Sequence, residues 1–307
     1  MEKLVILGGG CAGYTAAIYA ARAGLNPLLL TGKEPGGQLT LTTNVENYPG
    51  FENGVQGPLL MENMKKQALK FGTRIKSTTS KKFNIIKNGF ELETEKEKIQ
   101  TKSLIIATGA STRWLNISSE AKFKGRGVHT CATCDGYFYK NKEVVVIGGG
   151  DSACEESLFL SKLAKKVTII HRKDKFRASK IMQDRVKKNK NISIIWNSEV
   201  KEIKGNNGVE KIIIQDVNTK KNREIKTNGV FLAIGHTPNI EIFKNKIKLD
   251  KNGFIITDKK THTNVKGVFA AGDVQDPIFK QAVTSASTGC QAAMEAERYL
   301  GETEDKR

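Results

Sequence analysis

Two cysteines separated by two residues, Cys131 and Cys134, are the clearest chemical feature of this sequence. A C-x-x-C turn brings two sulfurs within disulfide reach, and Asp135 directly after it supplies a carboxyl group for proton transfer to or from a thiolate. The alternative is a zinc site, but a closed structural site needs four ligands, and only His129 is near the pair in sequence. The motif therefore favours redox chemistry without a metal.

The other cysteines point to a reducing compartment. Cys11, Cys154 and Cys290 sit beside small or apolar residues, where a free thiol behaves as a small hydrophobic group. Five cysteines so scattered do not form a disulfide scaffold. No apolar stretch approaches the roughly 20 residues of a membrane span, and the N-terminus does not resemble a signal peptide. We expect a cytoplasmic protein that does not enter a membrane.

Two glycine-rich turns have the pattern of sites that bind dinucleotides, the cofactors that redox chemistry at the cysteines would use. Gly8, Gly10 and Gly13 follow an apolar segment at 4–7 and precede an alanine-rich helix that reaches about residue 23. The same pattern recurs at Gly148 and Gly150, between a strand at 144–147 and a helix. In this context the glycines permit a tight turn and let the backbone approach a pyrophosphate, which the helix N-terminus attracts. Two β-α-β dinucleotide units are predicted.

The residues after the second unit indicate which nucleotide binds there. The strand at 167–170 is followed by His171, Arg172, Lys173 and, shortly after, Arg177. Basic residues at this place accommodate the 2′-phosphate of NADPH, whereas an acidic residue would hold the 2′-hydroxyl of NADH. A solvated basic loop is the alternative. We predict NADPH, with Arg172 and Arg177 as the best candidates for charge-assisted contacts.

The order of the strands predicts how the two units are arranged along the chain. Apolar strands run into glycine at 104–109 and at 230–235, and a third such segment, 268–273, follows after the second unit is complete. The economical arrangement inserts a domain at 113–241 into a first domain made of 1–112 and 242–307. The predicted fold class is therefore α/β, with two Rossmann-like dinucleotide-binding domains, the second inserted into the first.

Composition supports this arrangement and restricts the partners. A length of 307 residues suits about two domains, and 38% hydrophobic with 27% charged residues is typical of a globular protein. The net charge is +18, concentrated in the middle of the chain, but aromatic residues make up only 7% and no nucleic-acid motif is present. We expect anionic small ligands and no nucleic acid.

Taken in order, these motifs resemble the low-molecular-weight, bacterial-type thioredoxin reductases of the pyridine nucleotide-disulfide oxidoreductase family. The likeness covers nearly the whole chain. It rests on the first glycine turn, Cys-Ala-Thr-Cys-Asp-Gly at 131–136, the second turn with its basic residues, and Gly-Val-Phe-Ala-Ala-Gly-Asp at 267–273. The resemblance implies a homodimeric flavoprotein with FAD on the split domain, and with NADPH and the redox cysteines on the inserted domain.

The resemblance also assigns the binding residues. Asp273 takes the ribitol of FAD, and Gln281 with Ala282 meets the flavin ring. The FAD residues are Gly8, Gly10, Cys11, Ala12, Gly13, Gly37, Gln38, Asn47, Ala107, Gly109, Gly272, Asp273, Gln281 and Ala282. The NADPH residues are Gly148, Gly150, Asp151, Ser152, His171, Arg172, Lys173 and Arg177. Two positions depart from the family pattern, with Cys11 where proline is common and Lys173 where a second arginine is common.

The implied reaction passes a hydride from NADPH to FAD, then reduces the Cys131–Cys134 disulfide, and ends in dithiol exchange with oxidised thioredoxin. The resemblance makes Cys134 the thiol that faces the flavin and attacks the partner, Cys131 the resolving thiol and Asp135 the general acid and base. The domains are expected to rotate about 110–118 and 236–242. Relatives that reduce another disulfide protein or take electrons from ferredoxin are alternatives, as is a flavin-containing sensor or nucleic-acid-binding module. The intact basic loop argues against ferredoxin.

Overall fold

The chain forms two compact units joined by two crossings of the backbone. A computed structural model describes residues 1–32, 35–41 and 44–304. Unit 1 comprises Met1–Ser111 and Thr237–Arg307, and unit 2 comprises Thr112–His236. Unit 2 carries 25 Lys and Arg against 13 Asp and Glu, so it holds +12 of the net charge of +18. None of the helices described is long and apolar enough to cross a membrane.

Unit 1 is built on a seven-stranded sheet in the order β5-β2-β1-β8-β7-β6, with β19 also paired to β8. The parallel strands are β1 (Glu2–Leu7), β2 (Leu28–Leu30), β5 (Arg74–Lys76), β8 (Lys98–Ile106) and β19 (Val268–Ala270). An antiparallel hairpin of β6 (Lys82–Ile86) and β7 (Gly89–Glu93) extends the sheet. The strands β1, β8 and β19 overlap the apolar segments that the sequence predicted at 4–7, 104–109 and 268–273.

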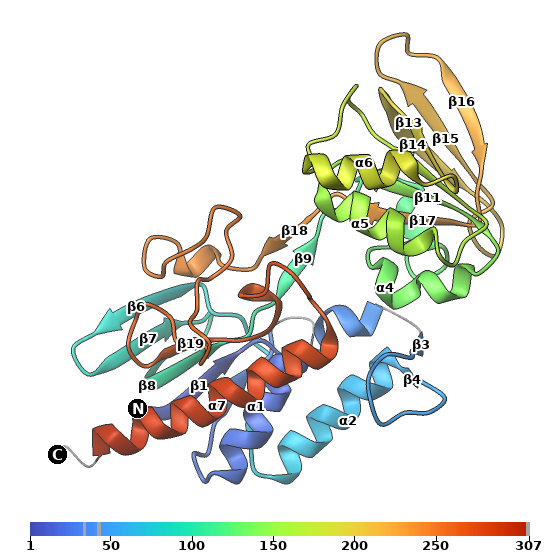
Figure 1. Cartoon of the computed structure of the whole chain (residues 1–307). Coiled ribbons are helices and arrows are strands. Elements are labelled where there is room, and N and C mark those ends of the chain that lie inside the picture. The colour runs from blue at the N-terminus through green and yellow to red at the C-terminus, as the bar shows by residue number, and fades with distance from the viewer. Residues whose placement is uncertain (33–34, 42–43, 305–307) are drawn as a thin grey trace. The chain divides into compact units, whose positions relative to one another are not determined.

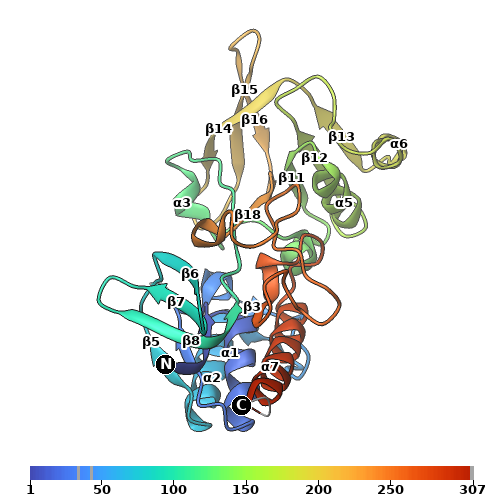
Figure 2. The same cartoon turned by 90° about the vertical axis from the view of Figure 1, so that its left-hand side faces the viewer.

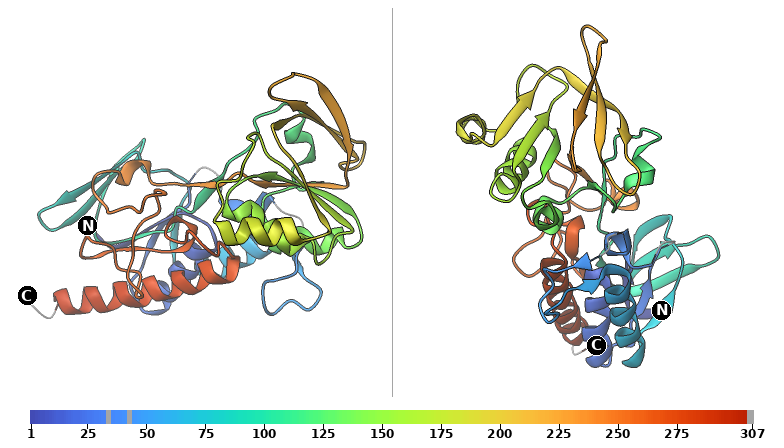
Figure 3. Two further views of the ribbon diagram at one scale, coloured as in Figure 1. Left: turned by 45° about the horizontal axis from the view of Figure 1, so that its top comes forward. Right: turned by 90° about the vertical axis from the view of Figure 1, so that its right-hand side faces the viewer.

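Three helices cover one face of this sheet: α1 (Cys11–Arg22), α2 (Gly57–Lys70) and α7 (Ala282–Glu304). They lie side by side in Figure 3 (right), and α1 packs closely on α7. Their contact is close because Gly289 of α7 is buried against α1, where a side-chain carbon would meet the carbonyl oxygen of Ala12 at 2.2 Å. The buried apolar side chains of the three helices and the sheet form one continuous core.

The other face of the sheet is covered by the segment that follows the second crossing. Its short helix η3 (Glu241–Phe243) places Phe243 against Phe83 of β6, with ring centroids 5.3 Å apart. Ile240 is buried in the same core. Residues 237–241 therefore lie in unit 1, whereas the sequence analysis placed them in the inserted domain. The remaining short elements of unit 1 are η1 (Gly37–Leu41), β3 (Asn44–Val45), β4 (Val55–Gln56) and η4 (Gly272–Val274).

Unit 2 contains a five-stranded parallel sheet in the order β10-β17-β11-β12-β13. These strands are β10 (Val128–His129), β11 (Glu143–Gly148), β12 (Lys166–Ile170), β13 (Ile192–Ile195) and β17 (Gly229–Ala233). Helices α5 (Asp151–Leu160) and α6 (Lys180–Lys188) lie on one side of it, and an antiparallel sheet lies on the other, as Figure 2 shows. The antiparallel strands are β14 (Ser198–Lys204), β15 (Lys211–Asp216) and β16 (Asn222–Lys226).

Short elements complete unit 2 and the crossings. Helices α3 (Glu120–Phe123), α4 (Ala132–Asp135) and η2 (Gly136–Tyr139) precede the parallel sheet's central strand. The backbone crosses between the units in β9 (Ala110–Thr112) and β18 (His236–Pro238), which pair with each other (Figure 1). Each unit thus carries a strand, a glycine turn and a helix in succession, which is the β-α-β element of a dinucleotide-binding domain.

Candidate functional site

The first glycine turn joins β1 to α1 in unit 1. A side-chain carbon on Gly8, whose φ is +110°, would lie 2.1 Å from the carbonyl oxygen of Ala107. On Gly13 it would lie 1.8 Å from the carbonyl oxygen of Gly8, so this glycine lets the helix pack on the turn. Gly10 faces open space, with no atom within 4 Å of that position. The turn therefore leaves its backbone free to be approached by a phosphate at the helix N-terminus.

A cavity of about 330 Å³ opens at this turn, within unit 1. It is lined by all the predicted FAD residues except Gly13, which packs beneath the turn, and Asn47: Gly8, Gly10, Cys11, Ala12, Gly37, Gln38, Ala107, Gly109, Gly272, Asp273, Gln281 and Ala282. The sequence analysis missed Asn239, whose side chain accepts a hydrogen bond from Ser111 at 2.8 Å and donates to the Thr108 carbonyl at 2.9 Å. No local pattern marked Asn239, because its partners lie about 130 residues earlier.

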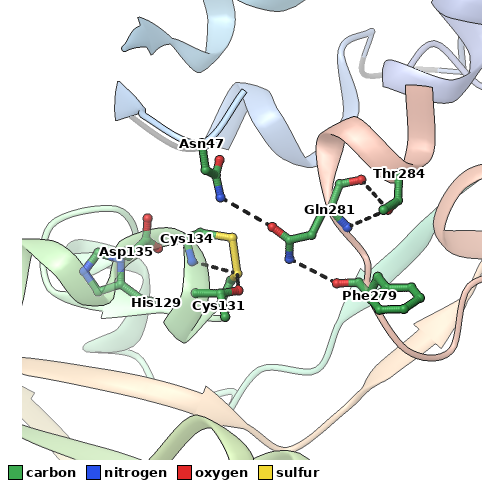
Figure 4. Close-up of a disulfide and its surroundings, with 9 residues drawn as sticks. Asn47, His129, Cys131, Cys134, Asp135, Phe279, Gln281 and Thr284 are labelled. Carbon is green, nitrogen blue, oxygen red and sulfur yellow. Dashed lines mark hydrogen bonds and ion pairs between the residues drawn. A yellow bond between two sulfur atoms is a disulfide. The ribbon is translucent and has the colours of Figure 1, made fainter. Parts of the chain in front are cut away.

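Gln281 stands at the entrance to α7 and is held by its neighbours (Figure 4). The Asn47 amide donates to its side-chain oxygen at 3.4 Å, and its own side-chain amide donates to the Phe279 carbonyl at 3.0 Å. Its backbone N–H donates to the Thr284 hydroxyl at 3.2 Å. Asn47 does not line the cavity but orients a residue that does. The N-terminus of this 23-residue helix favours negative charge.

Burial changes the pKa of two titratable groups that line the cavity, Asp273 and Cys11. Burial raises the pKa of Asp273, while a hydrogen bond from the Ser285 hydroxyl at 2.9 Å acts in the opposite direction. Burial, with a smaller contribution from Asp273, raises the pKa of Cys11 to about 12, and its thiol donates to the sulfur of Met64 at 3.5 Å. Cys11 is therefore a protonated packing thiol, and Asp273 is an acceptor suited to hydroxyl donors.

The second glycine turn joins β11 to α5 in unit 2. A side-chain carbon on Gly148 would meet the Ala233 carbonyl oxygen at 2.4 Å, whereas Gly150 faces open space. Asp151 and Ser152 are exposed in the first turn of α5. The Asp151 carboxylate accepts a hydrogen bond from the Ser179 N–H at 2.9 Å, which lowers its pKa.

The basic loop after β12 divides into a buried and an exposed part. His171 is buried, its Nε2 lies 3.1 Å from the Lys175 carbonyl oxygen, and burial lowers its pKa. Its ring also lies where a side chain on Gly149 would stand, so it supports the glycine turn from beneath. Arg172, Lys173 and Arg177 are exposed, and the Arg177 N–H donates to the Gly149 carbonyl at 2.7 Å. The backbone of Arg177 thus lies against the turn, and all three cationic side chains are exposed to solvent.

Cys131 and Cys134 form a disulfide at the start of α4, with an S–S distance of 2.04 Å (Figure 4). The N–H of Cys134 donates to the Cys131 sulfur at 3.2 Å, and the Thr133 hydroxyl lies 3.3 Å from the same sulfur. Elsewhere Cys154 is buried and its pKa is raised to about 11. Within the part of the chain that the structure describes, no three His, Cys, Asp or Glu side chains gather as metal ligands.

The carboxylate beside the disulfide belongs to a chain of three polar side chains. Asp135 Oδ2 lies 2.8 Å from His129 Nδ1, and His129 Nε2 lies 2.7 Å from the Tyr139 hydroxyl. The imidazole and carboxyl side chains are only 10% and 14% exposed. Burial and the nearby carboxylate raise the pKa of Tyr139 to about 12. The sequence analysis considered His129 only as a zinc ligand and did not single out Tyr139.

Comparisons with known proteins now decide the family. The family model described as pyridine nucleotide-disulphide oxidoreductase matches residues 2–289. The chain is 54% identical to the thioredoxin reductase of Rickettsia conorii, over 97% of this chain and 98% of that protein. It is 50% identical to the thioredoxin reductase of Escherichia coli O157:H7, over 97% and 96% of the two chains. The chain belongs to the pyridine nucleotide-disulphide oxidoreductase family, among the bacterial-type thioredoxin reductases.

Solved structures of this family agree. The crystal structure of thioredoxin reductase from Streptococcus pyogenes matches with a TM-score of 0.94 at 38% identity, over 98% of this chain and 99% of that chain. The thioredoxin reductase from Giardia duodenalis matches with a TM-score of 0.93 at 39% identity, over 97% and 98%. The predicted family, the α/β fold class with Rossmann-like domains and the prediction of an oxidoreductase with a redox disulfide are confirmed. Family membership also implies a flavin and a pyridine nucleotide in general terms.

Proposed function

We propose that this protein is an NADPH-dependent thioredoxin-disulfide reductase with FAD on unit 1 and NADPH on unit 2. The observation that carries the proposal is the Cys131–Cys134 disulfide with the Asp135 carboxylate directly after it. Unit 2, which holds this pair, also holds a glycine turn bordered by exposed cations. The chain is about half identical, over nearly its whole length, to proteins named thioredoxin reductase.

The residues of unit 1 fit FAD. Gly10 leaves space at the N-terminus of the 12-residue helix α1, where a pyrophosphate is stabilised by backbone N–H groups. Asp273 offers a carboxylate to the ribitol hydroxyls, and the start of α7 at Gln281 and Ala282 offers positive partial charge to a flavin ring. Gly37, Gln38, Ala107 and Gly109 complete the walls of the same cavity.

The residues of unit 2 fit NADPH. Gly150 leaves the N-terminus of the 10-residue helix α5 open to a pyrophosphate, with Ser152 exposed in its first turn. Arg172 and Arg177 provide charge-assisted donors to the 2′-phosphate, and Lys173 adds a point charge without a bidentate fork. His171 supports the turn and is assigned no contact with the nucleotide.

The reaction at the disulfide follows from the chain's own groups. When bound, NADPH and FAD supply the two electrons and one proton that reduce the disulfide. The S–S bond breaks to give one thiol and one thiolate. Asp135 acts as general acid and base: it donates the second proton to the thiolate and takes it back when that thiol attacks. The Cys134 thiolate attacks the partner's disulfide to form a mixed disulfide, and Cys131 releases the reduced partner by closing the original bond. This role order is taken from the family resemblance.

The same sulfurs must meet first the reducing centre and then an external protein, so we assign the connecting segments as hinges. These are residues 110–118 and 236–242, which include the paired strands β9 and β18. Hinge closures of this kind commonly run on microsecond to millisecond timescales. We further propose a homodimer, from the family resemblance, and action in the cytoplasm, because Cys11, Cys154 and Cys290 are free thiols.

The proposal is tested with purified protein under anaerobic conditions. The protein should be yellow, should bleach when NADPH is added and should recolour with oxidised thioredoxin. In an insulin-coupled assay, thioredoxin should support NADPH oxidation and glutathione disulfide should not. Failure to bleach with NADPH would favour a ferredoxin-dependent enzyme or a sensor. Bleaching without recolouring by thioredoxin would point to another disulfide protein as the partner.

A further inference from the structure

Asp135 is hydrogen-bonded to His129, and His129 to Tyr139. The reaction above requires only the carboxylate as general acid and base, so the two further side chains need an explanation. All three side chains come from unit 2, within eleven residues of sequence, yet from three elements, β10, α4 and η2. The imidazole is almost enclosed and uses both ring nitrogens. Hydrogen bonds at both ring nitrogens, in a place largely shielded from water, hold the imidazole in one geometry.

The surrounding apolar residues hold this chain in place. The His129 ring stacks on Phe231, with centroids 5.3 Å apart, and Tyr139 meets both rings edge-on. Tyr139 fits because Gly229 has no side chain: a carbon there would lie 2.4 Å from the tyrosine ring. The strand pair β10–β17 sets His129 opposite Phe231 in register. The imidazole therefore has little freedom to turn away from Asp135.

The donor and acceptor inventory then selects one tautomer. An ionised carboxylate only accepts, so Nδ1 must carry the hydrogen that points to Asp135. A neutral imidazole with its hydrogen on Nδ1 has a lone pair on Nε2, and the Tyr139 hydroxyl, which stays protonated, can donate to it. Lys142 also faces this group, with its Nζ 5.6 Å from the Tyr139 ring centroid. Phe231 on the remaining side carries no charge.

We propose that His129 is a positioning residue for proton transfer at the disulfide. Its Nδ1–H holds in one orientation the carboxylate of Asp135, the residue that follows Cys134, while Tyr139 fixes the imidazole in its Nδ1–H tautomer. This rests on the proposed function. In the exchange step the dithiol loses two electrons and two protons as the Cys131–Cys134 bond forms. The partner's disulfide breaks and gains the same two electrons and two protons. Asp135 accepts a proton from the attacking thiol and returns it to the partner's leaving sulfur.

The first test reads the tautomer directly in the full-length protein. The protein is labelled with ¹⁵N at histidine, and the ring-nitrogen shifts of His129 are assigned with the His129→Asn variant. At pH 7 we expect Nδ1 protonated and Nε2 unprotonated, the opposite of the tautomer that free histidine prefers. An Nε2–H tautomer, or free ring rotation, would overturn the proposal. This measurement needs neither NADPH nor thioredoxin, so its result does not depend on whether the proposed function is correct.

The second test measures the pH profile of single-turnover exchange. Each variant is reduced with dithiothreitol, freed of it and mixed with oxidised thioredoxin or with a small aromatic disulfide. His129→Phe keeps the stacked ring but removes both hydrogen bonds, so the carboxylate loses its donor and its protonated form is favoured. We expect the rate at pH 7 to fall by about tenfold or more, and the profile to move to higher pH. His129→Asn, which can still donate to Asp135, should recover most of that loss.

Controls separate this effect from a general loss of imidazole. Tyr139→Phe removes one hydroxyl and should give a smaller shift in the same direction as His129→Phe. His262→Asn removes a different imidazole, in unit 1, whose Nδ1 also lies 2.8 Å from a carboxylate, that of Asp258. It should leave the pH profile unchanged. A His129→Phe profile identical to wild type, or a loss that His129→Asn does not recover, contradicts the positioning role.

Discussion

At the scale of single residues, the exposed cations Arg172 and Arg177 after β12 allow a direct test of whether the protein prefers NADPH to NADH. Arg172→Ala combined with Arg177→Ala should raise the KM for NADPH far more than that for NADH. Two charge-assisted contacts to the 2′-phosphate are lost, each worth about 1.5–3 kcal/mol. Steady-state kinetics with the two nucleotides measures this. Lys187→Ala with Lys188→Ala removes the same charge from the exposed end of α6 and should change neither KM appreciably. An equal rise in KM for both nucleotides would contradict the assignment of Arg172 and Arg177 to the 2′-phosphate.

The two sulfurs have different assigned roles, and serine variants distinguish them. Cys131→Ser and Cys134→Ser should each abolish thioredoxin reduction yet keep bound FAD that NADPH still reduces, because flavin reduction uses neither sulfur. Cys131→Ser should trap, as a mixed disulfide on a non-reducing gel, a thioredoxin that lacks its own resolving cysteine. Cys290→Ser is the control and should keep activity.

Other outcomes of the serine experiment are equally informative. Trapping by Cys134→Ser instead of Cys131→Ser would reverse the roles and keep the enzyme class. A disulfide with a purely structural role would show itself by joint loss of folded protein and flavin in both variants. No trap in either variant would argue against thioredoxin as the substrate.

Asp273 should show a conflict between stability and FAD binding. Because burial raises its pKa in the folded state, its charged form costs stability above that pKa, and the cost disappears below its unfolded value of about 4. Asp273→Asn should therefore raise the melting temperature of the flavin-free protein at pH 7, with the gain fading as the pH approaches 4. FAD affinity should fall by roughly tenfold or more, since hydrogen bonds to a charged group are worth about 1.5–3 kcal/mol.

Calorimetric melting of the flavin-free protein across pH, with FAD titrations alongside, measures both effects. Ser285→Ala is the informative companion, because it removes the hydroxyl that donates to Asp273 at 2.9 Å. It should lower the stability at pH 7 instead of raising it. An Asp273→Asn protein that is less stable at pH 7 and binds FAD normally would contradict the assignment.

At the scale of elements, the contact between α1 and α7 depends on one glycine. Gly289→Ala would place a carbon 2.2 Å from the Ala12 carbonyl oxygen, so the helices must separate. Overpacking of this kind typically destabilises by about 1–3 kcal/mol. Because Ala12 also lines the cavity, FAD retention should fall with stability. Urea unfolding and the flavin-to-protein absorbance ratio measure the two effects.

The same helix offers a matched control for this prediction. Gly301 is exposed near the end of α7, and a side-chain carbon there meets nothing within 4 Å. Gly301→Ala should leave FAD binding unchanged and stabilise the protein by up to about 1 kcal/mol, because alanine is the better helix former. Similar losses in both variants would show that α7 tolerates neither change for reasons other than its packing on α1.

At the scale of the whole molecule, the insertion predicts that unit 2 is a folding unit. Its own sheets and helices hold three apolar clusters, and its ends emerge in the paired strands β9 and β18. A fragment of residues 112–236 should therefore unfold cooperatively and bind NADP⁺ with the affinity of the full chain, but hold no FAD. Circular dichroism melting and calorimetric titration test this. A fragment without a cooperative transition would show that unit 2 depends on unit 1 for its stability.

The sequence by itself determined the features that depend on neighbours along the chain. The glycine turns at Gly8 and Gly148, and the strands and helices around them, follow from residues within one β-α-β segment. The Cys131–Cys134 disulfide closes between residues three apart, so no distant contact is needed to bring the sulfurs together. The helix predicted after the first glycine turn reached about residue 23, and α1 ends at Arg22. Local hydrogen bonding fixes the type of such elements better than it fixes their ends.

Only the tertiary structure decided which side chains meet. Asn47 reaches Gln281 across 234 positions, and Asn239 closes the cavity wall at Ser111 across 128 positions. His129 joins Asp135 and Tyr139 because a strand register sets it on Phe231, and because Gly229 leaves room for the tyrosine ring. Such contacts depend on register and close packing, and a shift of one residue in a strand would turn each side chain to the opposite face. The periodicity and motif spacing of the sequence do not show which residues of two neighbouring strands are paired.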